Sequence, residues 1–240
     1  MGKPWTDGPR ELIQHAIDHL AAGGDFDRRI AMISIDNAVE LMAKVYLGLP
    51  KRARKGDGPS RKDLDAASES FPDLLSLLET HASDRLQGIG LDDIEWYHRL
   101  RNQLYHSGNG ITVEREKVET YLSLARSLFE SLFQEDLTLL GDTAHQTGVG
   151  KFMQTWIQLE RLQRDSERRR RGSATELEPD FSRRAGAWEF ARIDPGLANL
   201  FEGARRFRNE LVHGLAAPDP DQLKRQTDAV KQLIAALSKK

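Results

Sequence analysis

The sequence predicts an all-α fold, and three observations support that prediction. Apolar residues recur every three or four positions through most of the 240-residue chain, which is the period of an amphipathic helix. No stretch shows a convincing alternation of apolar and polar residues, which is typical of a half-buried strand. Glycine and proline interrupt the helical pattern, as at Gly48 and Pro50, so that the chain divides into separate helices.

The first 140 residues are expected to form one helical bundle. The helix over about 26–47 carries apolar residues around much of its circumference, so we expect it at the centre of that bundle. The expected elements, in order, are a helix opened by Pro9 and stopped at Gly23, the helix over 26–47, a basic loop over 51–60, a helical segment interrupted near Pro72, a helix from about Leu91 to His106, and a long helix that Thr112 caps and that ends near Gly141.

Residues 141–150 are rich in glycine and polar residues and are interpreted as a linker. The linker separates a domain over 1–140 from a shorter domain over 151–240. The expected elements of the second domain are a helix from Lys151 into the arginine-rich stretch 161–171, a polar loop over 172–180, a helix opened by Asp194-Pro195 and ending at His213, and a last helix opened by Asp219-Pro220.

Composition excludes several classes of function. The chain has no cysteine, which excludes disulfides, thiolate metal sites and thiol catalysis. It carries 35 Lys and Arg against 37 Asp and Glu, a net charge of −2, whereas proteins that coat nucleic acid are usually basic overall. No apolar run is long enough to span a membrane and no signal-peptide core is present, so we expect a soluble, cytoplasmic protein that does not associate with membranes.

The chain contains an internal repeat. Residues 99–106 read Arg-Leu-Arg-Asn-Gln-Leu-Tyr-His, and residues 206–213 read Arg-Phe-Arg-Asn-Glu-Leu-Val-His. A glycine follows each copy within two residues, and an amphipathic helix follows the glycine. Duplication of a helical module explains this repeat better than coincidence does.

Each copy combines residue types that suit acid–base cleavage of a phosphodiester. Asn and His stand at positions i and i+4 on one helical face, and Arg precedes the Asn. Arg supplies a cation for phosphate, Asn an orienting group, and His a group that titrates near neutral pH. In RNA the 2′-hydroxyl supplies the nucleophile, so no metal ion is required. The candidate catalytic residues are Arg101, Asn102, His106, Arg208, Asn209 and His213.

An alternative interpretation of the repeat stays open. A His in the last turn of a helix often interacts only with the helix dipole, and a neighbouring Arg is often simply solvated.

At these motifs the chain resembles the HEPN superfamily, whose signature is an Arg followed a few residues later by a His, commonly with Asn after the Arg. Residues 36–47 also look like the core helix of that family, and the resemblance covers residues 10–135 well and 150–238 more weakly. It implies two HEPN-like helical bundles packed as an intramolecular pseudo-dimer. In that arrangement the two motifs face each other and form one composite ribonuclease site.

The resemblance also implies a function. We expect a metal-independent endoribonuclease without cofactor or metal ion, acting as a toxin or phage-defence effector with RNA as substrate and an antitoxin or defence-complex protein as partner. Two alternatives stay open: a non-catalytic HEPN module that binds a nucleotide or a partner within a larger complex, and a homo-oligomer with separate sites. Many HEPN toxins carry a Tyr two residues after the His, where nucleotides are added. Gly108 and Leu215 stand there in this chain, so we do not expect that modification.

Secondary candidates lie outside the repeat. Asp36 and Glu40 are polar residues in an apolar helix; they either support the arginines of the motifs or form an exposed stripe or interhelical hydrogen bonds. Basic residues could steer RNA, or could simply form a solvated helix end and loop. His15 and His19 have no convincing third ligand, so no metal site is expected. The candidate RNA-binding residues are Lys51, Arg52, Arg54, Lys55, Arg161, Arg164, Arg168, Arg169, Arg170 and Arg171.

Overall fold

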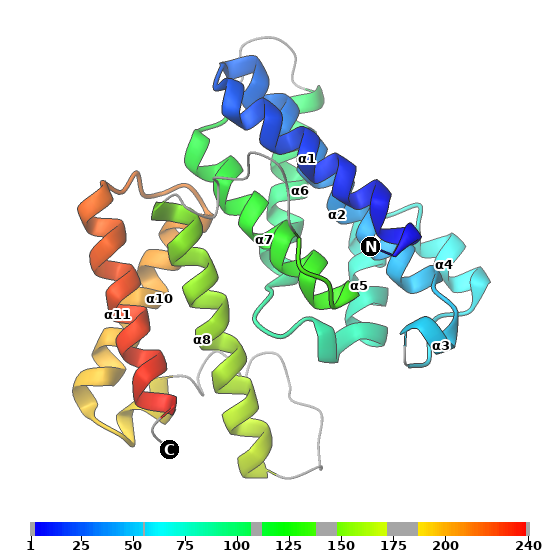
Figure 1. The fold of residues 1–240 in the computed structure, drawn as a ribbon. Helices are drawn as coiled ribbons and strands as arrows, with labels where there is room; N and C mark the ends of the chain where they lie inside the picture. Colours follow the sequence, from blue (N-terminus) through cyan, green and yellow to red (C-terminus); the bar gives the residue numbers. More distant parts are fainter. Residues whose placement is uncertain (1–2, 55, 107–111, 138–147, 172–186, 239–240) are drawn as a thin grey trace. The chain divides into compact units, whose positions relative to one another are not determined.

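The computed structural model describes residues 3–54, 56–106, 112–137, 148–171 and 187–238. Within these ranges every regular element is a helix and no strand occurs, so the predicted all-α fold is confirmed (Figure 1). The chain divides into two compact units, Met1–Ala144 and His145–Lys240. None of the described helices is both long and apolar enough to cross a lipid bilayer.

Helix α2 (Asp25–Gly48) is the centre of the N-terminal unit, as its apolar circumference predicted. The side chains of Met32, Ile35, Val39 and Met42 are completely buried along its length. Five helices pack against it, with α1 and α7 running alongside (Figure 1). They are α1 (Asp7–Ala22), α4 (Arg61–Ala67), α5 (Phe71–Ala82), α6 (Leu91–His106) and α7 (Arg115–Phe133).

Local sequence signals explain several helix ends. Helix α1 stops where Gly23 adopts a left-handed conformation, with φ of 80°, and its N–H donates to the carbonyl of His19 at 3.3 Å. The interruption expected near Pro72 is the break between α4 and α5. Pro72 stands in the first turn of α5, where a missing backbone N–H costs nothing, and Ser70 caps that helix. These two boundaries agree with the sequence-based expectation.

Two expected boundaries in this unit are wrong. The basic loop over 51–60 begins with a short helix, α3 (Lys51–Arg54), because the carbonyl of Pro50 accepts hydrogen bonds from the next turn. Thr112 does not cap the long helix. Helix α7 begins only at Arg115, after Glu114 in an extended conformation, and the carbonyl of the buried Val113 accepts a hydrogen bond from Arg28 Nε at 2.9 Å.

Helix α7 also ends earlier than expected. Phe133 is its last residue, and Gln134 adopts a left-handed conformation with φ of 54°. The N–H of Gln134 donates to the carbonyl of Glu130 at 3.0 Å and closes the helix. Gly141, where the end was expected, lies outside the described residues.

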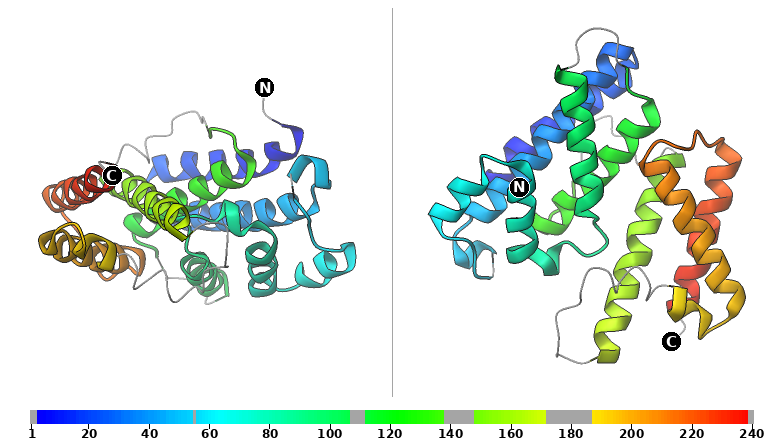
Figure 2. Two further views of the ribbon diagram at one scale, coloured as in Figure 1. Left: turned by 90° about the horizontal axis from the view of Figure 1, so that it is seen from below. Right: turned by 180° about the vertical axis from the view of Figure 1, so that it is seen from behind.

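The C-terminal unit is built from α8 (Gly148–Arg171), α10 (Pro195–Val212) and α11 (Pro220–Ser238), with a short helix over 187–191. Helix α11 packs against both α8 and α10 (Figure 2). Aromatic pairs between α8 and α10 form the core of the C-terminal unit. The centres of the Phe152 and Phe207 rings lie 5.0 Å apart, and those of Trp156 and Phe201 lie 5.8 Å apart.

In this unit the two expected helix starts are confirmed, whereas the expected end of the linker is wrong. Asp194 caps α10 by accepting a hydrogen bond from the N–H of Gly196 at 2.6 Å, and Asp219 caps α11 in the same way through Gln222 at 2.7 Å. The last three residues of the linker expected over 141–150 are helical instead. Val149 is buried, and a Cβ on Gly148 would lie 2.9 Å from Leu223, so close packing on α11 overrides the low helix propensity of glycine. Residues 141–147 lie outside the described part, as does the loop expected over 172–180.

Candidate functional site

The Arg101 guanidinium is held on three sides by side chains of α2 and α6. Its Nη2 donates to Asn37 Oδ1 at 3.0 Å and its Nη1 donates to Asn102 Oδ1 at 2.9 Å. Its Nε lies 3.3 Å from Asp36 Oδ2 as an ion pair. The side chain is 20% exposed, so the guanidinium has a fixed orientation and still reaches the protein surface.

The Asp36 carboxylate organises this arrangement from inside the bundle. It is completely buried, and its partners come from other helices than its own. These partners come from two helices: the Tyr121 hydroxyl on α7 donates to Oδ1 at 2.8 Å, and on α6 His98 Nδ1 lies 3.0 Å from Oδ2, beside the Arg101 ion pair. A buried carboxylate is tolerated only with such partners, because its desolvation costs several kcal/mol. Asp36 therefore ties α2, α6 and α7 together and positions Arg101. We call Asp36, Asn37, His98, Arg101, Asn102 and Tyr121 the Arg101 cluster.

Tyr121 is a permanent donor in this cluster. Burial raises the pKa of its hydroxyl well above the ordinary value, and the neighbouring Asp36 carboxylate raises it further. The Tyr121 ring is stacked on that of Tyr97 at 4.5 Å, and the His98 ring on that of Phe71 at 4.0 Å. These stacks fix both rings, so the donors have little freedom to leave the carboxylate.

The two residues proposed as supporting groups have different surroundings. For Asp36 the structure selects interhelical hydrogen bonding over an exposed stripe. Glu40 instead pairs with Lys44 one turn along the same helix, at 2.6 Å. Sequence reasoning missed His98 and Tyr121. The spacing of His98 from Arg101 and Asn102, i to i+3 and i+4, was a usable signal, whereas nothing in the sequence brings Tyr121 to Asp36.

The remaining motif residue of the first copy is His106. It is the last residue of α6, so the helical backbone keeps it one turn after Asn102, but its side chain lies outside the described part of the structure. Tyr105, next to it, is 63% exposed, and the Arg101 guanidinium carbon lies 5.5 Å from the centre of its ring. The last turn of α6 therefore presents an aromatic ring beside Arg101 at the surface.

The second copy repeats the local geometry of the first. Arg208 Nη1 donates to Asn209 Oδ1 at 3.3 Å, as Arg101 does to Asn102. His213 follows α10 as its C-terminal cap, and its backbone N–H donates to the carbonyl of Asn209 at 3.0 Å. Its side chain is exposed. In each unit the motif thus places Arg and Asn side by side, with the His one turn later at the helix end.

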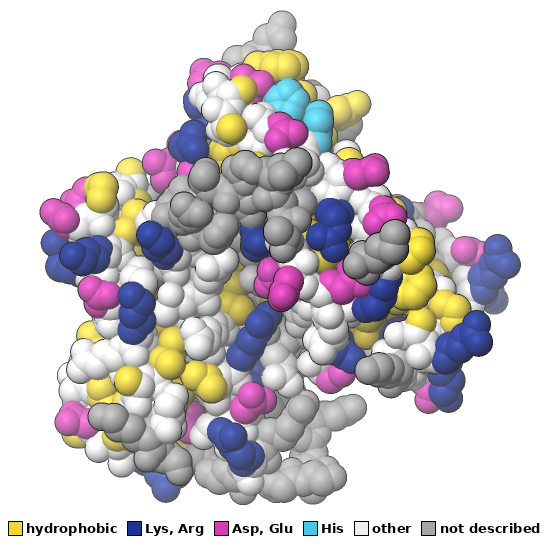
Figure 3. All heavy atoms as spheres, viewed as in Figure 1, with side chains coloured by type: hydrophobic (Ala, Val, Ile, Leu, Met, Phe, Trp, Pro, Cys, Tyr) yellow, Lys and Arg dark blue, Asp and Glu magenta, His cyan; other side chains and the backbone are white. Residues whose placement is uncertain are grey.

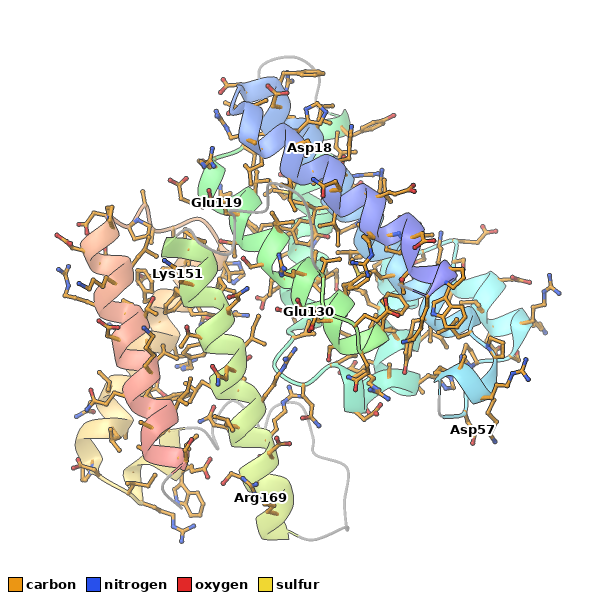
Figure 4. All side chains as sticks on the ribbon, in the orientation of Figure 1. Asp18, Asp57, Glu119, Glu130, Lys151 and Arg169 are labelled. Carbon is orange, nitrogen blue, oxygen red and sulfur yellow. The ribbon has the colours of Figure 1, made fainter. Side chains whose placement is uncertain are left out.

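The candidate RNA-binding residues of the first unit do not form one continuous surface. Arg54 is only 8% exposed, and its Nη1 donates to the carbonyl of Leu47 at 2.5 Å, so it is a buried residue and not part of a basic loop surface. Lys51 and Arg52 are exposed, and Lys51 pairs at 2.6 Å with Asp57, which projects from the loop after α3 (Figure 4). Lys55 lies outside the described residues.

Helix α8 carries the other candidates. Arg169 projects from its C-terminal end and is exposed (Figure 4), whereas Arg161 and Arg164 are half-buried. The side chains of Arg168, Arg170 and Arg171 lie outside the described part. On the face drawn in Figure 3, basic side chains are interspersed with acidic ones and do not gather into one patch.

His15 and His19, the pair that lacks a third ligand, are engaged with neighbours. The rings of His15 and His19 meet edge-on at 4.6 Å, His15 Nδ1 lies 2.9 Å from Ser34 Oγ, and His19 Nδ1 lies 2.8 Å from Asp27 Oδ1. Among the residues with described side chains, no group of three His, Asp or Glu is arranged to hold a metal ion.

Each unit places a motif guanidinium beside an amide, with a His at the helix end, and in the first unit three side chains orient that guanidinium. Such groups are able to bind a phosphate and transfer protons. No protein-family model matches the chain, and searches among curated proteins and among solved structures found no match either.

Proposed function

We propose that this protein is a tandem HEPN endoribonuclease that cleaves RNA without a metal ion. The observation that carries the proposal is the Arg101 cluster. A buried carboxylate, Asp36, and two amides fix the orientation of a motif arginine whose side chain still reaches the surface. An arginine oriented in advance stabilises a developing charge without the entropic cost of ordering it during the reaction.

The proposed mechanism is an internal transfer at phosphorus. One histidine, His106 or His213, takes the proton from the 2′-hydroxyl, whose oxygen attacks the adjacent phosphorus. The bond from phosphorus to the 5′-oxygen breaks, and the other histidine gives its proton to that leaving oxygen. Arg101 and Arg208 neutralise the charge on the phosphorane oxygens. The products are a 2′,3′-cyclic phosphate and a 5′-hydroxyl.

The test of this function is incubation of the purified chain with total RNA in EDTA. The wild type is expected to cleave RNA and leave 2′,3′-cyclic phosphate ends, and the double variant His106→Ala/His213→Ala is expected to be inactive. His81→Ala is the matched control, since His81 lies on α5 outside both motifs. Equal cleavage by wild type and double variant would reject the proposal.

A mixing experiment separates a site within one chain from a site between chains. His106→Ala and His213→Ala proteins are each prepared alone and then combined. If the two motifs of one chain act on one phosphate, the mixture stays inactive. Recovery of cleavage in the mixture means that motifs of different chains complete the site, as in a homo-oligomer.

One observation favours a second candidate function. Three side chains already engage the Arg101 guanidinium, which also suits a structural role in a non-catalytic module that binds a nucleotide or a partner protein. Binding of RNA or nucleotide without cleavage would select this alternative. A role as a cytoplasmic toxin or phage-defence effector belongs to the nuclease proposal, which predicts that the wild type arrests growth on expression and the double variant does not.

A further inference from the structure

A small pocket lies in the N-terminal unit, apart from the Arg101 cluster. It lies where the 3₁₀ helix η1 (Pro4–Thr6), the C-terminal ends of α2 and α7, helix α3 and the 3₁₀ helix η2 (Ser83–Arg85) come together. Three cationic side chains line it, Lys3, Arg54 and Arg85, together with Tyr46 and Trp5. A concave site lined by three cations suits an anion.

Arg54 is the least satisfied of these cations. Its side chain is buried, yet its Nε has no hydrogen-bond partner, and no carboxylate of a described residue lies within ion-pair distance of it. Among the described residues, its guanidinium donates one hydrogen bond, to the carbonyl of Leu47. Leaving a buried guanidinium N–H without a partner is unfavourable. An oxyanion in the pocket would offset the charge of this guanidinium.

Gly58 leaves the room that this guanidinium occupies. A Cβ at position 58 would lie 1.7 Å from Arg54 Nη2 and 1.9 Å from its Cζ, which is far closer than two atoms can approach. Glycine is therefore required here for space and not for backbone conformation. The substitution Gly58→Ala would displace the Arg54 guanidinium without removing its charge.

The other two cations are partly compensated. Arg85 Nε lies 3.3 Å from Asp84, whose side chain is 62% exposed and therefore weakens the pair through solvent screening. Lys3 Nζ lies 3.3 Å from Glu135 Oε1 and donates to the carbonyl of Phe133 at 2.7 Å. Asp84 and Glu135 are thus fewer than the three cations of the lining, and Glu135 also pairs with Arg10 at 3.3 Å, so the pocket carries excess positive charge.

Tyr46 adds a neutral donor to the pocket. Burial raises the pKa of its hydroxyl, although the nearby Arg85 charge opposes the shift, so the group stays protonated at neutral pH. Trp5 lines the same pocket and is 39% exposed, which leaves ring surface for an organic group attached to a bound anion.

We propose that this pocket binds the phosphate group of a small ligand, with Arg54, Arg85 and Tyr46 as donors. The positive charge of Arg54 and Arg85 and the planar shape of their guanidinium groups match the oxygens of a phosphate. The inference does not rest on the proposed nuclease function, since none of these residues belongs to the repeated motif. The phosphate can be free or part of a nucleotide, and the two sources are distinguished by experiment.

The experiment is calorimetric titration of the full chain with inorganic phosphate and, separately, with AMP, each at constant ionic strength set with KCl. Saturable binding of at least one of them is expected. Arg54→Gln and Gly58→Ala are each expected to weaken it at least tenfold. Arg61→Gln is the matched control, because Arg61 is exposed at the start of α4 and its replacement removes the same charge.

Each outcome bears on the proposal. Phosphate binding as tight as AMP binding identifies the free anion as the ligand, whereas AMP binding at least tenfold tighter identifies a nucleotide with contacts to Trp5. No saturable binding to the wild type overturns the proposal, as does unchanged binding in a folded Arg54→Gln or Gly58→Ala protein. Circular dichroism establishes folding, and if Arg54→Gln does not fold, Gly58→Ala and the wild-type titrations decide.

Discussion

Asp36 and Arg101 form an ion pair in which Oδ2 of the completely buried carboxylate lies 3.3 Å from Nε of the guanidinium. The pair joins the central helix α2 to the helix that carries the first Arg-Asn-x-x-x-His motif. Asp36 is buried in the core, whereas the Arg101 side chain reaches the surface, so the pair connects the core to the proposed site. The stability of the bundle and the orientation of Arg101 thus depend on the same contact.

Replacement of Asp36 by Asn is expected to destabilise the protein by about 2–4 kcal/mol, because the amide nitrogen faces donors where a carboxylate oxygen accepted and the Arg101 charge loses its partner. The free energy of unfolding in urea measures this change. Asp65→Asn is the control, since Asp65 is exposed on α4. Equal stability of the Asp36 variant and the control would show that the buried pair contributes nothing.

Replacement of Tyr121 by Phe is expected to cost about 1–3 kcal/mol, because the buried carboxylate loses a hydrogen bond of 2.8 Å. Tyr105→Phe, at an exposed position, is expected to cost little. The free energy of unfolding in urea is measured for both variants. Equal values would show that the Tyr121 hydroxyl does not stabilise the protein.

Tyr121 is also expected to make the stability of the protein depend on pH in the alkaline range. The pKa of Tyr121 is higher in the folded than in the unfolded protein, so the folded state keeps a proton that the unfolded state loses above about pH 10. Stability is therefore expected to be independent of this group below about pH 10 and to fall as pH rises further. The fall should be smaller in Tyr121→Phe; an identical alkaline unfolding curve for the variant would contradict the account.

Glu135 is expected to stabilise the N-terminal segment in the opposite pH range. Burial raises its pKa, but the donors Lys3 and Thr6 outweigh burial and lower it. A carboxyl with a lowered pKa contributes stability above its unfolded pKa and loses it as pH falls. Glu135→Gln is thus expected to cost about 1 kcal/mol at pH 7 and less at pH 3, measured by urea unfolding at both pH values. A cost that does not shrink at pH 3 would be inconsistent with ionic stabilisation.

Replacement of Arg101 by Lys is expected to lower RNA cleavage about a hundredfold while the protein remains folded. A lysine cannot contact Asp36, Asn37 and Asn102 at once in the geometry of a guanidinium. Arg99→Lys is the matched control on the same helix, because Arg99 is exposed and makes only a 3.7 Å pair with Glu95. Initial rates of cleavage measure both, and equal rates would remove Arg101 from the proposed site.

Local signals in the sequence predicted much of the fold. The helix expected from Leu91 to His106 is α6, and the caps at Asp194 and Asp219 are as expected, because short-range hydrogen bonds and glycines determine these ends. The cap expected at Thr112 is wrong: α7 begins only at Arg115, and the preceding Val113 is tied to Arg28 by a hydrogen bond between residues 85 positions apart, which no local signal predicts.

The motif residues of the site could be predicted from the sequence, but the residues that contact them could not. Arg101 and Asn102 follow from the repeat, but their partners converge from helices far away in sequence. Tyr121 stands 85 residues from Asp36, and His98 stands 62 residues from it. No pattern along the chain encodes such contacts, and the burial of Arg54 depends in the same way on neighbours that fold around it.

The rate of RNA cleavage in EDTA by the single variants His106→Ala and His213→Ala tests the central claim most directly. If the two motifs form one site, each substitution alone is expected to lower the rate roughly a hundredfold to ten-thousandfold, since each histidine transfers a proton that the other cannot. His81→Ala should retain the wild-type rate. Wild-type activity in either single variant would contradict a composite site, and absence of cleavage by the wild-type protein would contradict the assignment as a ribonuclease.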